Sequence, residues 1–345
     1  MILQDKLRRM AKRKVKFGVA GLGHIANKSI LPAFAGSTHA ELVTVFSSDP
    51  AKRAGIASKY EVSQTFSYDE FEIGLKQQKI EALYLALPNS LHKEYAVRAA
   101  RCGVHVLCEK PLASSAADCQ AMIDAARESK VKLMVAYRHH FGAAHQDAME
   151  TAHGGKLGEL RSFHSVFTLQ VRENNPRTER AMGGGTLPDI GIYVINVARQ
   201  LFRAEPQRVY GFTATRSDDP RFTEVEEMFT GVMQFPKDRL ATFTCGFGSA
   251  RVMTYTIVGT QGALYVDPAY DYGSDVSSEL IIDGVRERRV FQKQDQFAAG
   301  IDYFARCVLY DEPPAQSGEE ALADISVVET LYQSAGENAR AAAGM

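Results

Sequence analysis

The sequence contains no tryptophan, and its five cysteines include no CxxC pair. An odd set of cysteines without such a pair forms no disulfide framework and fits a reducing compartment, so we expect a cytoplasmic protein. No apolar run approaches the roughly 18 residues that cross a bilayer, so no membrane partner is expected. The net charge of −1 lacks the basic excess of nucleic-acid-binding proteins, which excludes that partner class as well.

Two further patterns are missing. Residues 1–14 are basic but lack the apolar core of a secretory signal, so we interpret them as a solvated leader before the first strand. His139, His140, His145 and His153 lie close in sequence, but adjacent histidines point to different faces. Neither HExxH nor a set of cysteines or carboxylates accompanies them, so we expect no bound metal.

What is present predicts two α/β domains. The 345 residues exceed the ~250–300 at which a single core stops growing. Up to residue 138, short strands that are apolar on both faces alternate with helices, as in a parallel sheet covered on both sides. We expect strands at 15–20, 41–46, 82–86, 104–107 and 132–136, and helices at 25–34, 50–59, 68–77, 91–101 and 114–129.

From residue 139 to residue 345 the strands become longer and alternate between apolar and polar residues. This alternation is typical of an antiparallel sheet with helices on one face. We expect strands at 160–171, 206–215, 225–235, 240–247, 253–258 and 263–266, weaker strands at 280–282 and 287–291, and helices at 142–153, 188–202, 295–309 and 319–335.

A glycine motif joins the first strand to the first helix. Gly21 allows a tight turn, Gly23 lets backbone amides approach a pyrophosphate, and Ala26 is small enough for close packing of helix on strand. The helix N-terminus adds partial positive charge. The segment, which also holds Leu22, His24 and Ile25, predicts a dinucleotide site; a glycine turn without a ligand is the alternative.

The end of the second strand bears on the choice of dinucleotide. An NAD-preferring site places an Asp or Glu there, but the strand runs into Ser47 and Ser48. The first acid, Asp49, already lies in the cap of the next helix, and Lys52 and Arg53 follow. Hydroxyls and cations suit a 2′-phosphate, so NADP is favoured over NAD. The alternative is that Ser48 or Asp49 is only a helix N-cap and that Lys52 and Arg53 are solvated. The two interpretations are compatible with each other.

Two more strand ends carry polar groups. Leu87, Pro88 and Asn89 turn the chain after the third strand, three residues before His92, and could contact ribose or nicotinamide. After the fourth strand, proline holds Lys110 in extended backbone at the kind of edge where open parallel sheets bind ligands. Structural turns and a solvated Glu–Lys ion pair are the alternatives.

A triple glycine precedes a helix in the second half. Gly183, Gly184 and Gly185 let the chain approach something closely, and the helix starts near residue 188. Asp189 and Tyr193 are four residues apart, so they share one helical face and are candidates for proton transfer. A capping aspartate and an ordinary buried tyrosine are the alternative.

Taken in order, these motifs resemble the glucose–fructose oxidoreductase/inositol dehydrogenase/rhizopine-catabolism oxidoreductase family over residues 16–335. The glucose–fructose oxidoreductase subgroup is the most similar, in part because Tyr193 stands where many relatives carry histidine. The supporting segments are GLGHIA at 21–26, LPNSLH at 87–92, CEKP at 108–111, YR at 137–138, GGGTLPDIGIY at 183–193, ILPAFAG at 30–36, ADCQAMIDAA at 117–126 and RFTEVEE at 221–227.

The resemblance implies an NADP-dependent sugar oxidoreductase with a Rossmann domain at 1–138. It also implies a substrate-binding α/β domain at 139–345 with a large, mostly antiparallel open sheet. Such sheets pack between subunits, giving a homodimer or homotetramer, and the C-terminal helices could pack back on the first domain. By position, catalysis would fall to Lys110, Asp189 and Tyr193, and the 2′-phosphate contacts to Ser47 and Lys52. Further positions near the cofactor match Tyr68, Glu109, Arg138 and, more loosely, Arg177.

The expected reaction moves a hydride between C1 of an aldose such as glucose or xylose and C4 of NADP, giving a lactone. A coupled exchange between two sugars with retained NADP stays open, although the short leader lacks the cofactor-clasping arm of a periplasmic relative. Reduction of a different carbonyl such as an anhydro-ketose, oxidation of a diol, and a dinucleotide-binding co-regulator without turnover stay open too.

Overall fold

The computed structural model describes residues 13–343, so most of the expected basic leader lies outside the described residues. The chain divides into two compact units. The first unit comprises Met1–Ala113, Ala117–Arg138 and Asp295–Leu322, and the second comprises Ser114–Ala116, His139–Gln294 and Ala323–Met345. No helix in the described part of the chain is long and apolar enough to cross a membrane.

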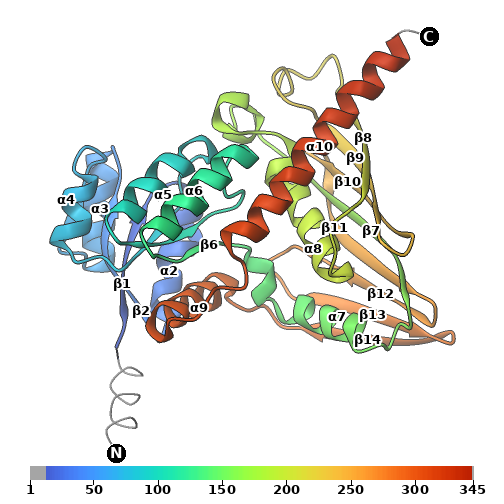
Figure 1. The fold of residues 1–345 in the computed structure, drawn as a ribbon, viewed down its shortest axis with the longest axis horizontal. Coiled ribbons are helices and arrows are strands. Elements are labelled where there is room, and N and C mark those ends of the chain that lie inside the picture. The colour runs from blue at the N-terminus through green and yellow to red at the C-terminus, as the bar shows by residue number, and fades with distance from the viewer. Residues whose placement is uncertain (1–12, 344–345) are drawn as a thin grey trace, which may run out of the picture. The chain divides into compact units, whose positions relative to one another are not determined.

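The first unit is built on a six-stranded parallel sheet in the order β3-β2-β1-β4-β5-β6, the order of a Rossmann fold (Figure 1). The strands are β1 (Val15–Ala20), β2 (Ala40–Phe46), β3 (Gln64–Phe66), β4 (Ala82–Leu85), β5 (His105–Cys108) and β6 (Leu133–Val135). This confirms the expected fold class. Strand β3 was not predicted, because three residues are too few to show a period.

Helices cover this sheet and close its core. They are α2 (Leu31–Ala33), α3 (Pro50–Tyr60), α4 (Phe71–Gln77), α5 (His92–Arg101), α6 (Ala116–Glu128) and α9 (Gln296–Tyr310), with a π-helical turn at Ala26–Ile30 before α2. Phe17 of β1 is fully buried, and its ring lies edge-on to Phe34 at 5.5 Å and to Phe304 of α9 at 6.4 Å. Helix α9 therefore belongs to the core of the first unit, although it comes late in the chain.

The second unit contains an eight-stranded sheet in the order β14-β13-β12-β11-β7-β10-β9-β8. Its neighbours are antiparallel except for the parallel pair β10 and β7, which confirms a large, mostly antiparallel sheet. The strands are β7 (Leu160–Gln170), β8 (Arg208–Ala214), β9 (Met228–Phe235), β10 (Arg239–Gly246), β11 (Gly248–Gly259), β12 (Gly262–Asp267), β13 (Val276–Ile282) and β14 (Val285–Phe291).

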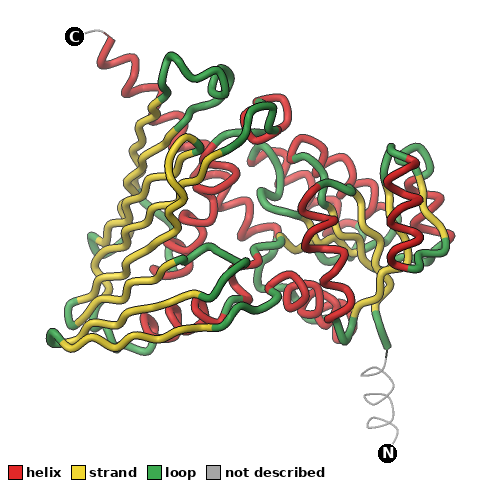
Figure 2. Tube along the Cα trace, turned by 180° about the vertical axis from the view of Figure 1, so that it is seen from behind, coloured by secondary structure: helices red, strands yellow, loops and turns green. Residues whose placement is uncertain are grey.

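Helices α7 (Ala143–His153), α8 (Ile192–Phe202) and α10 (Gly318–Ala343) lie along one face of this sheet. Figure 2 shows the other face without a helix in front of it among the described residues. Strand β9 alternates between buried and exposed residues accordingly. A π-helical turn at Leu187–Gly191 leads directly into α8, most of whose side chains are buried. Asp189 thus lies in the turn that leads into a largely buried helix.

Candidate active site

The turn after β1 contains two glycines that differ in what surrounds them. Gly21 has a φ of +97°, and a Cβ placed there would lie 2.3 Å from the carbonyl oxygen of Ala86. Packing within the protein therefore requires glycine at this position. At Gly23, by contrast, no described atom lies within 4 Å of such a Cβ. This open backbone fits the close approach of a dinucleotide phosphate, as the sequence motif predicts.

The carbonyl groups of the same turn are occupied by one side chain. The Asn27 amide donates to the carbonyl oxygens of Leu22 at 2.8 Å and Gly23 at 3.0 Å. Gly23 and His24 are exposed, and Ile25 is half-buried. The exposed start of this helix supports an anion-binding role for the segment, because the first N–H groups of a helix have no intrahelical acceptors.

The loop after β2 holds both a helix cap and a cluster of donors. Asp49 accepts two backbone N–H groups of α3, and the one from Lys52 is the main cause that lowers the pKa of this carboxyl group. The buried Ser47 hydroxyl accepts from Asp49 N–H at 3.2 Å, while Ser48 and Lys52 are exposed. The Arg53 guanidinium donates to the Ser47 carbonyl, which fixes a second cation at this strand end.

Tyr68 lies beside the glycine turn. Burial, and secondarily the field of Tyr95, raise the pKa of Tyr68 to about 12, while a backbone hydrogen bond at Gly21 opposes them. The rings of Tyr68 and Tyr95 pack with centroids 5.1 Å apart. The phenol thus remains neutral and is held at the turn where the cofactor phosphates are expected.

His92 joins the loops that follow β4 and β5. Its fully buried ring places Nε2 2.9 Å from the Leu87 carbonyl oxygen and Nδ1 2.9 Å from that of Pro111. Burial lowers the pKa of His92. Pro88 and Asn89 form the start of the 3-10 turn between Leu87 and His92. The predicted place of His92 in the cofactor site is therefore indirect, through the two loops that its ring connects.

Glu109 and Lys110 follow β5. The Glu109 carboxylate accepts from the Tyr84 hydroxyl at 2.8 Å and from the Lys110 backbone N–H at 3.3 Å. Burial raises the pKa of Glu109, against the hydrogen bond from Tyr84 and the fields of Lys110 and Arg138. The peptide bond between Lys110 and Pro111 is cis. Arg138, which follows β6, is buried and donates to the Gln296 side chain at 3.0 Å.

The structure therefore brings the predicted first-unit residues to one edge of the sheet. Parallel strands end at a common edge, and the ends of β1, β2, β4, β5 and β6 all carry predicted residues. In open α/β sheets, ligands bind outside this carboxyl edge, next to the point where the strand order reverses. That point lies between β1 and β4, whose ends carry Gly21 and Leu87.

In the second unit, Asp189 forms an ion pair that the sequence spacing did not indicate. Arg177 Nε lies 2.6 Å from Asp189 Oδ2; the aspartate side chain is 16% exposed and the arginine 50%. Tyr193 is buried on α8, and its ring contacts those of His139 at 5.3 Å, Phe167 at 6.0 Å and Tyr270 at 6.2 Å. Asp189 and Tyr193 thus lie at the start of one buried helix.

The triple glycine makes the predicted close approach, and its partner is the protein's own chain. A Cβ at Gly184 would lie 2.4 Å from the carbonyl oxygen of Arg177, and one at Gly185 would lie 2.6 Å from the Tyr332 hydroxyl. Gly185 also has a φ of +131°. Its N–H donates to the Arg177 carbonyl at 2.9 Å. The glycines thus press the Arg177 turn against the helix that carries Asp189.

Glu226 anchors the start of that helix and was not among the predicted residues. Its Oε1 accepts from Thr186 N–H at 2.7 Å, from the Thr186 hydroxyl at 2.5 Å and from the Tyr332 hydroxyl at 2.7 Å. Burial raises the pKa of Tyr332 above its ordinary value, with the Glu226 charge adding to the effect. The only sequence signal was the RFTEVEE segment, which contains Glu226 but gives no spacing to Thr186.

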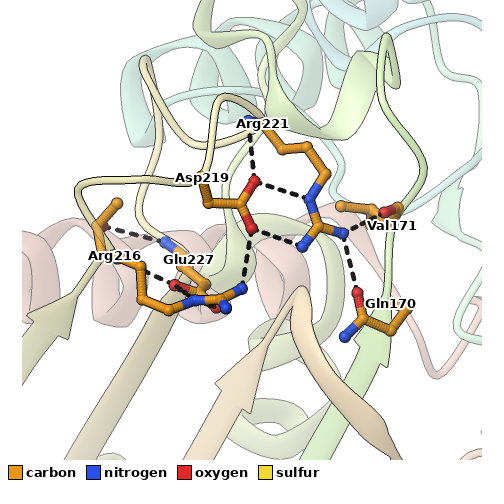
Figure 3. A network of polar contacts seen from close by, with 7 residues as sticks. Gln170, Val171, Arg216, Asp219, Arg221 and Glu227 are labelled. Atoms are coloured by element: carbon orange, nitrogen blue, oxygen red, sulfur yellow. Dashed lines mark hydrogen bonds and ion pairs between the residues drawn. The ribbon is translucent and has the colours of Figure 1, made fainter.

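A network of hydrogen bonds and ion pairs, shown in Figure 3, holds the loop before Glu226 in place. Asp219 accepts from the guanidinium groups of Arg216 at 2.9 Å and Arg221 at 2.7 Å. The hydrogen bond from Arg221 is the main cause that lowers the pKa of Asp219 to about 2. Arg221 also donates to the carbonyl oxygen of Val171, just beyond β7, and Arg216 to Glu227. The segment is thereby fixed to the sheet.

The clustered histidines form hydrogen bonds with α8. His139 and His140 place Nε2 at 3.1 and 2.7 Å from Asn196 Oδ1, and His145 places Nε2 2.8 Å from Gln200 Oε1. His153 contacts the Leu201 carbonyl oxygen at 3.1 Å. Among the described residues, no group of three or more His, Cys, Asp or Glu side chains is arranged to hold a metal ion.

Comparison with known proteins agrees with this geometry. Residues 15–137 match the model described as "Oxidoreductase family, NAD-binding Rossmann fold", and residues 145–265 match the "GFO/IDH/MocA C-terminal domain". D-xylose 1-dehydrogenase (NADP(+)) 2 of Haloferax volcanii is 30% identical over 92% of this chain and 97% of its own. The chain belongs to the GFO/IDH/MocA oxidoreductase family.

Two solved structures show the same fold. Aldose-aldose oxidoreductase from Caulobacter crescentus, complexed with glycerol, is 34% identical with a TM-score of 0.91, covering 94% of this chain and 98% of its own. A 3-ketoreductase from Actinomadura kijaniata, in complex with NADP and TDP-benzene, is 26% identical with a TM-score of 0.85, covering 93% and 98%.

Proposed function

We propose that this protein is an NADP-dependent sugar oxidoreductase that oxidises C1 of an aldose of the glucose or xylose type to a lactone. The observation that carries the proposal is the end of β2, where Ser47, Ser48, Lys52 and Arg53 replace the acid of an NAD site. The names of the relatives support both NADP and an aldose.

NADP would be held by the turn at Gly21 and Gly23 and, through its 2′-phosphate, by Ser47, Ser48 and Lys52. Positions near the cofactor further include Leu22, His24, Ile25, Tyr68, Leu87, Pro88, Asn89, His92, Glu109, Lys110 and Arg138. When bound, NADP supplies the acceptor for the hydride that leaves C1 of the sugar.

Three residues are proposed to act on the sugar itself. The Tyr193 phenolate takes the proton of the C1 hydroxyl as the hydride leaves C1. A phenol with an ordinary pKa near ~10 is a poor base at neutral pH, so a neighbouring cation is needed to favour its ionised form. We assign that charge to the Lys110 ammonium group, and we assign Asp189 to a hydrogen bond with the sugar or with Lys110.

The test is a panel of aldoses with NADP⁺ and NAD⁺, using wild type, Lys110→Ala and Tyr193→Phe. We expect turnover of at least one aldose with NADP⁺ preferred, and a loss of roughly 10²–10⁴-fold in each variant, the usual contribution of acid–base catalysis. Lys93→Ala is the control, because Lys93 pairs with Asp118 on the surface of the first unit. If both variants stay within a few-fold of wild type, the catalytic assignment is wrong.

A second candidate is a coupled exchange in which one sugar is oxidised and another reduced with retained NADP. The similarity to an aldose-aldose oxidoreductase favours it. Purified protein would then release NADP on denaturation and would turn over a sugar pair without added nucleotide. Activity that depends strictly on added NADP⁺ contradicts this candidate. Reduction of a ketone alone, oxidation of a diol, or NADP binding without turnover are the remaining outcomes of the same panel.

We further propose that the protein forms a dimer or tetramer through the open face of the second unit's sheet. Most of the large apolar side chains that are exposed in the described part of the chain lie on this sheet. They include Tyr210 and Phe212 of β8, which are 56% and 63% exposed. A sheet face that exposes several large apolar side chains is typical of subunit interfaces. No disulfide bond joins any of the five cysteines in the described structure, which supports a reducing, cytoplasmic location.

A further inference from the structure

Arg177 is a cation that directly contacts Asp189 within the second unit. Its Nε lies 2.6 Å from Asp189 Oδ2, which is the distance of a close ion pair. Asp189 is largely buried, whereas half of the arginine side chain is exposed. The sequence predicted Arg177 as a residue near the cofactor. Its contact with Asp189 indicates a different role.

The backbone of Arg177 is fixed on both sides. Its N–H donates to the Asn175 side chain at 3.1 Å, and its carbonyl accepts from Gly185 N–H at 2.9 Å. Gly184 leaves no room for a side chain against that carbonyl. The helix start is held separately by the contacts of Thr186 with Glu226. Two independent anchors therefore set the arginine and the aspartate facing each other.

The charge balance around Tyr193 gives this pair a consequence. An ionised Asp189 one helical turn away disfavours a phenolate at Tyr193, because like charges repel. The Arg177 guanidinium offsets the negative charge of that carboxylate. The interaction is mutual, because the charge of Asp189 and, more weakly, those of Tyr193 and Tyr272 raise the pKa of Arg177. Other titratable groups of the second unit that face this helix start include His139, Tyr270, Tyr272, Tyr332, Cys245 and Glu226.

We propose that Arg177 is a positioning residue for the proposed sugar oxidation. Its guanidinium pairs with the Asp189 carboxylate, holds it correctly aimed, and offsets its negative charge beside Tyr193. The C1 hydroxyl proton can then be removed near neutral pH. The inference rests on the proposed function, and it adds a second cation to Lys110.

The experiment compares the pH profile of kcat/KM between pH 5 and 10 for wild type, Arg177→Gln and Arg177→Lys. In Arg177→Gln we expect a loss of about 10–100-fold at pH 7 and a shift of the pH of half-maximal activity to higher values, by about one unit. Arg177→Lys should recover part of both effects, because an ammonium keeps the charge without the fork geometry of a guanidinium.

Two measurements separate this role from others. The dissociation constant for NADPH should stay within twofold of wild type in Arg177→Gln; a tenfold rise with an unmoved pH profile would make Arg177 a cofactor contact instead. Arg180→Gln is the matched control, because Arg180 lies in the same loop and bonds the Glu224 carbonyl. If this control loses activity as Arg177→Gln does, with neither profile shifted, the role of Arg177 is only structural.

A measurement that needs no sugar can test the Arg177–Asp189 pair even if the proposed function is wrong. If wild type oxidises no aldose, the proposed function fails, and the pair is then tested by urea unfolding of Arg177→Gln, Asp189→Asn and the double variant. Coupling between the two substitutions supports the positioning role. If the two substitutions change the unfolding midpoint additively, the positioning role is overturned. Removing a guanidinium that orients Asp189 should destabilise the protein more when the carboxylate is still present than when it is already replaced.

Discussion

Gly21 and Gly23 show at the scale of single residues that one motif can combine two separate requirements. Gly21 is needed by the protein itself, because its positive φ and the Ala86 carbonyl leave no place for a side chain. Gly23 has no such neighbour in the described structure. The sequence motif treats both as parts of a phosphate turn, whereas the structure separates folding from binding.

Substitution by alanine should reveal this difference. Gly23→Ala should weaken NADPH binding by tenfold or more and leave the urea midpoint of the apoprotein unchanged, because the added methyl group meets only the cofactor. Gly21→Ala should lower the unfolding free energy by about 1–3 kcal/mol, the usual cost of a strained backbone position. Fluorescence titration and urea unfolding measure the two effects.

The control for this pair is Gly55→Ala, since Gly55 lies in α3 with no described atom near its Cβ position. It should affect NADPH binding little and stability by less than about 1 kcal/mol. A Gly23→Ala variant that binds NADPH as wild type does would contradict the proposed cofactor turn.

Local spacing located some site residues and could not locate others. The motifs placed Gly21, Lys110 and Asp189 at element ends, because a strand–turn–helix pattern or a proline is visible in a few consecutive letters. The partners Arg177 and Glu226 were not assigned their roles, since Arg177 reaches Asp189 across an irregular glycine loop and Glu226 reaches Thr186 from 40 residues away. Such contacts depend on tertiary packing, which no periodicity reports.

Helix α8 shows at the scale of elements how a group of side chains can support one surface. Four histidines from the segment around α7 contact it in chain order. Burial lowers the pKa of His140 to about 4 and that of His145 to about 3. Both rings are therefore neutral in the folded protein at pH 7, so α8 meets two uncharged histidines on this side.

This packing predicts a loss of stability in mild acid. An unfolded histidine titrates near ~6.5, so below that pH the unfolded state binds more protons than the folded state. The free energy of unfolding should fall as pH drops from about 6.5 towards 4, with a slope of up to ~1.4 kcal/mol per pH unit for each histidine. Urea unfolding at a series of pH values measures this slope.

His145→Gln should flatten this pH dependence, because glutamine can still hydrogen-bond Gln200 but does not titrate. His24→Gln serves as the control, since His24 is exposed in the first unit, whereas α8 belongs to the second, and should leave the slope unchanged. An unaltered slope in His145→Gln would show that burial of this histidine does not govern the acid response.

Most elements were predictable, because alternation and helical spacing extend over many residues. The structure confirms every strand expected in the second unit, including the weak ones at β13 and β14, although β11 starts five residues earlier than predicted. Helix α10 continues to Ala343 instead of residue 335, because its alanine-rich end favours a helix. Strand β3 was missed, since it is held by pairing with β2 rather than by its own pattern.

At the scale of the whole molecule, the open sheet face predicts self-association. We expect wild type to elute as a dimer or tetramer in size-exclusion chromatography with light scattering. Phe212→Asp with Val232→Lys should shift it towards the monomer, because both side chains lie exposed on neighbouring strands of this face. Ile73→Asp is the control, as Ile73 is 53% exposed on α4. A monomeric wild type would contradict the proposed interface.

The place of α9 in the chain has a consequence for protein synthesis. Phe304 completes the core around Phe17 and Phe34, yet it is translated only after the eight strands of the second unit. Ser317, which forms a bridge with Met134 at the edge of β6, emerges later still. On the ribosome, the first unit must therefore keep an uncovered apolar surface until most of the chain has been made. The unit that begins first is therefore completed only near the end of translation, which makes this surface a natural binding site for chaperones until then.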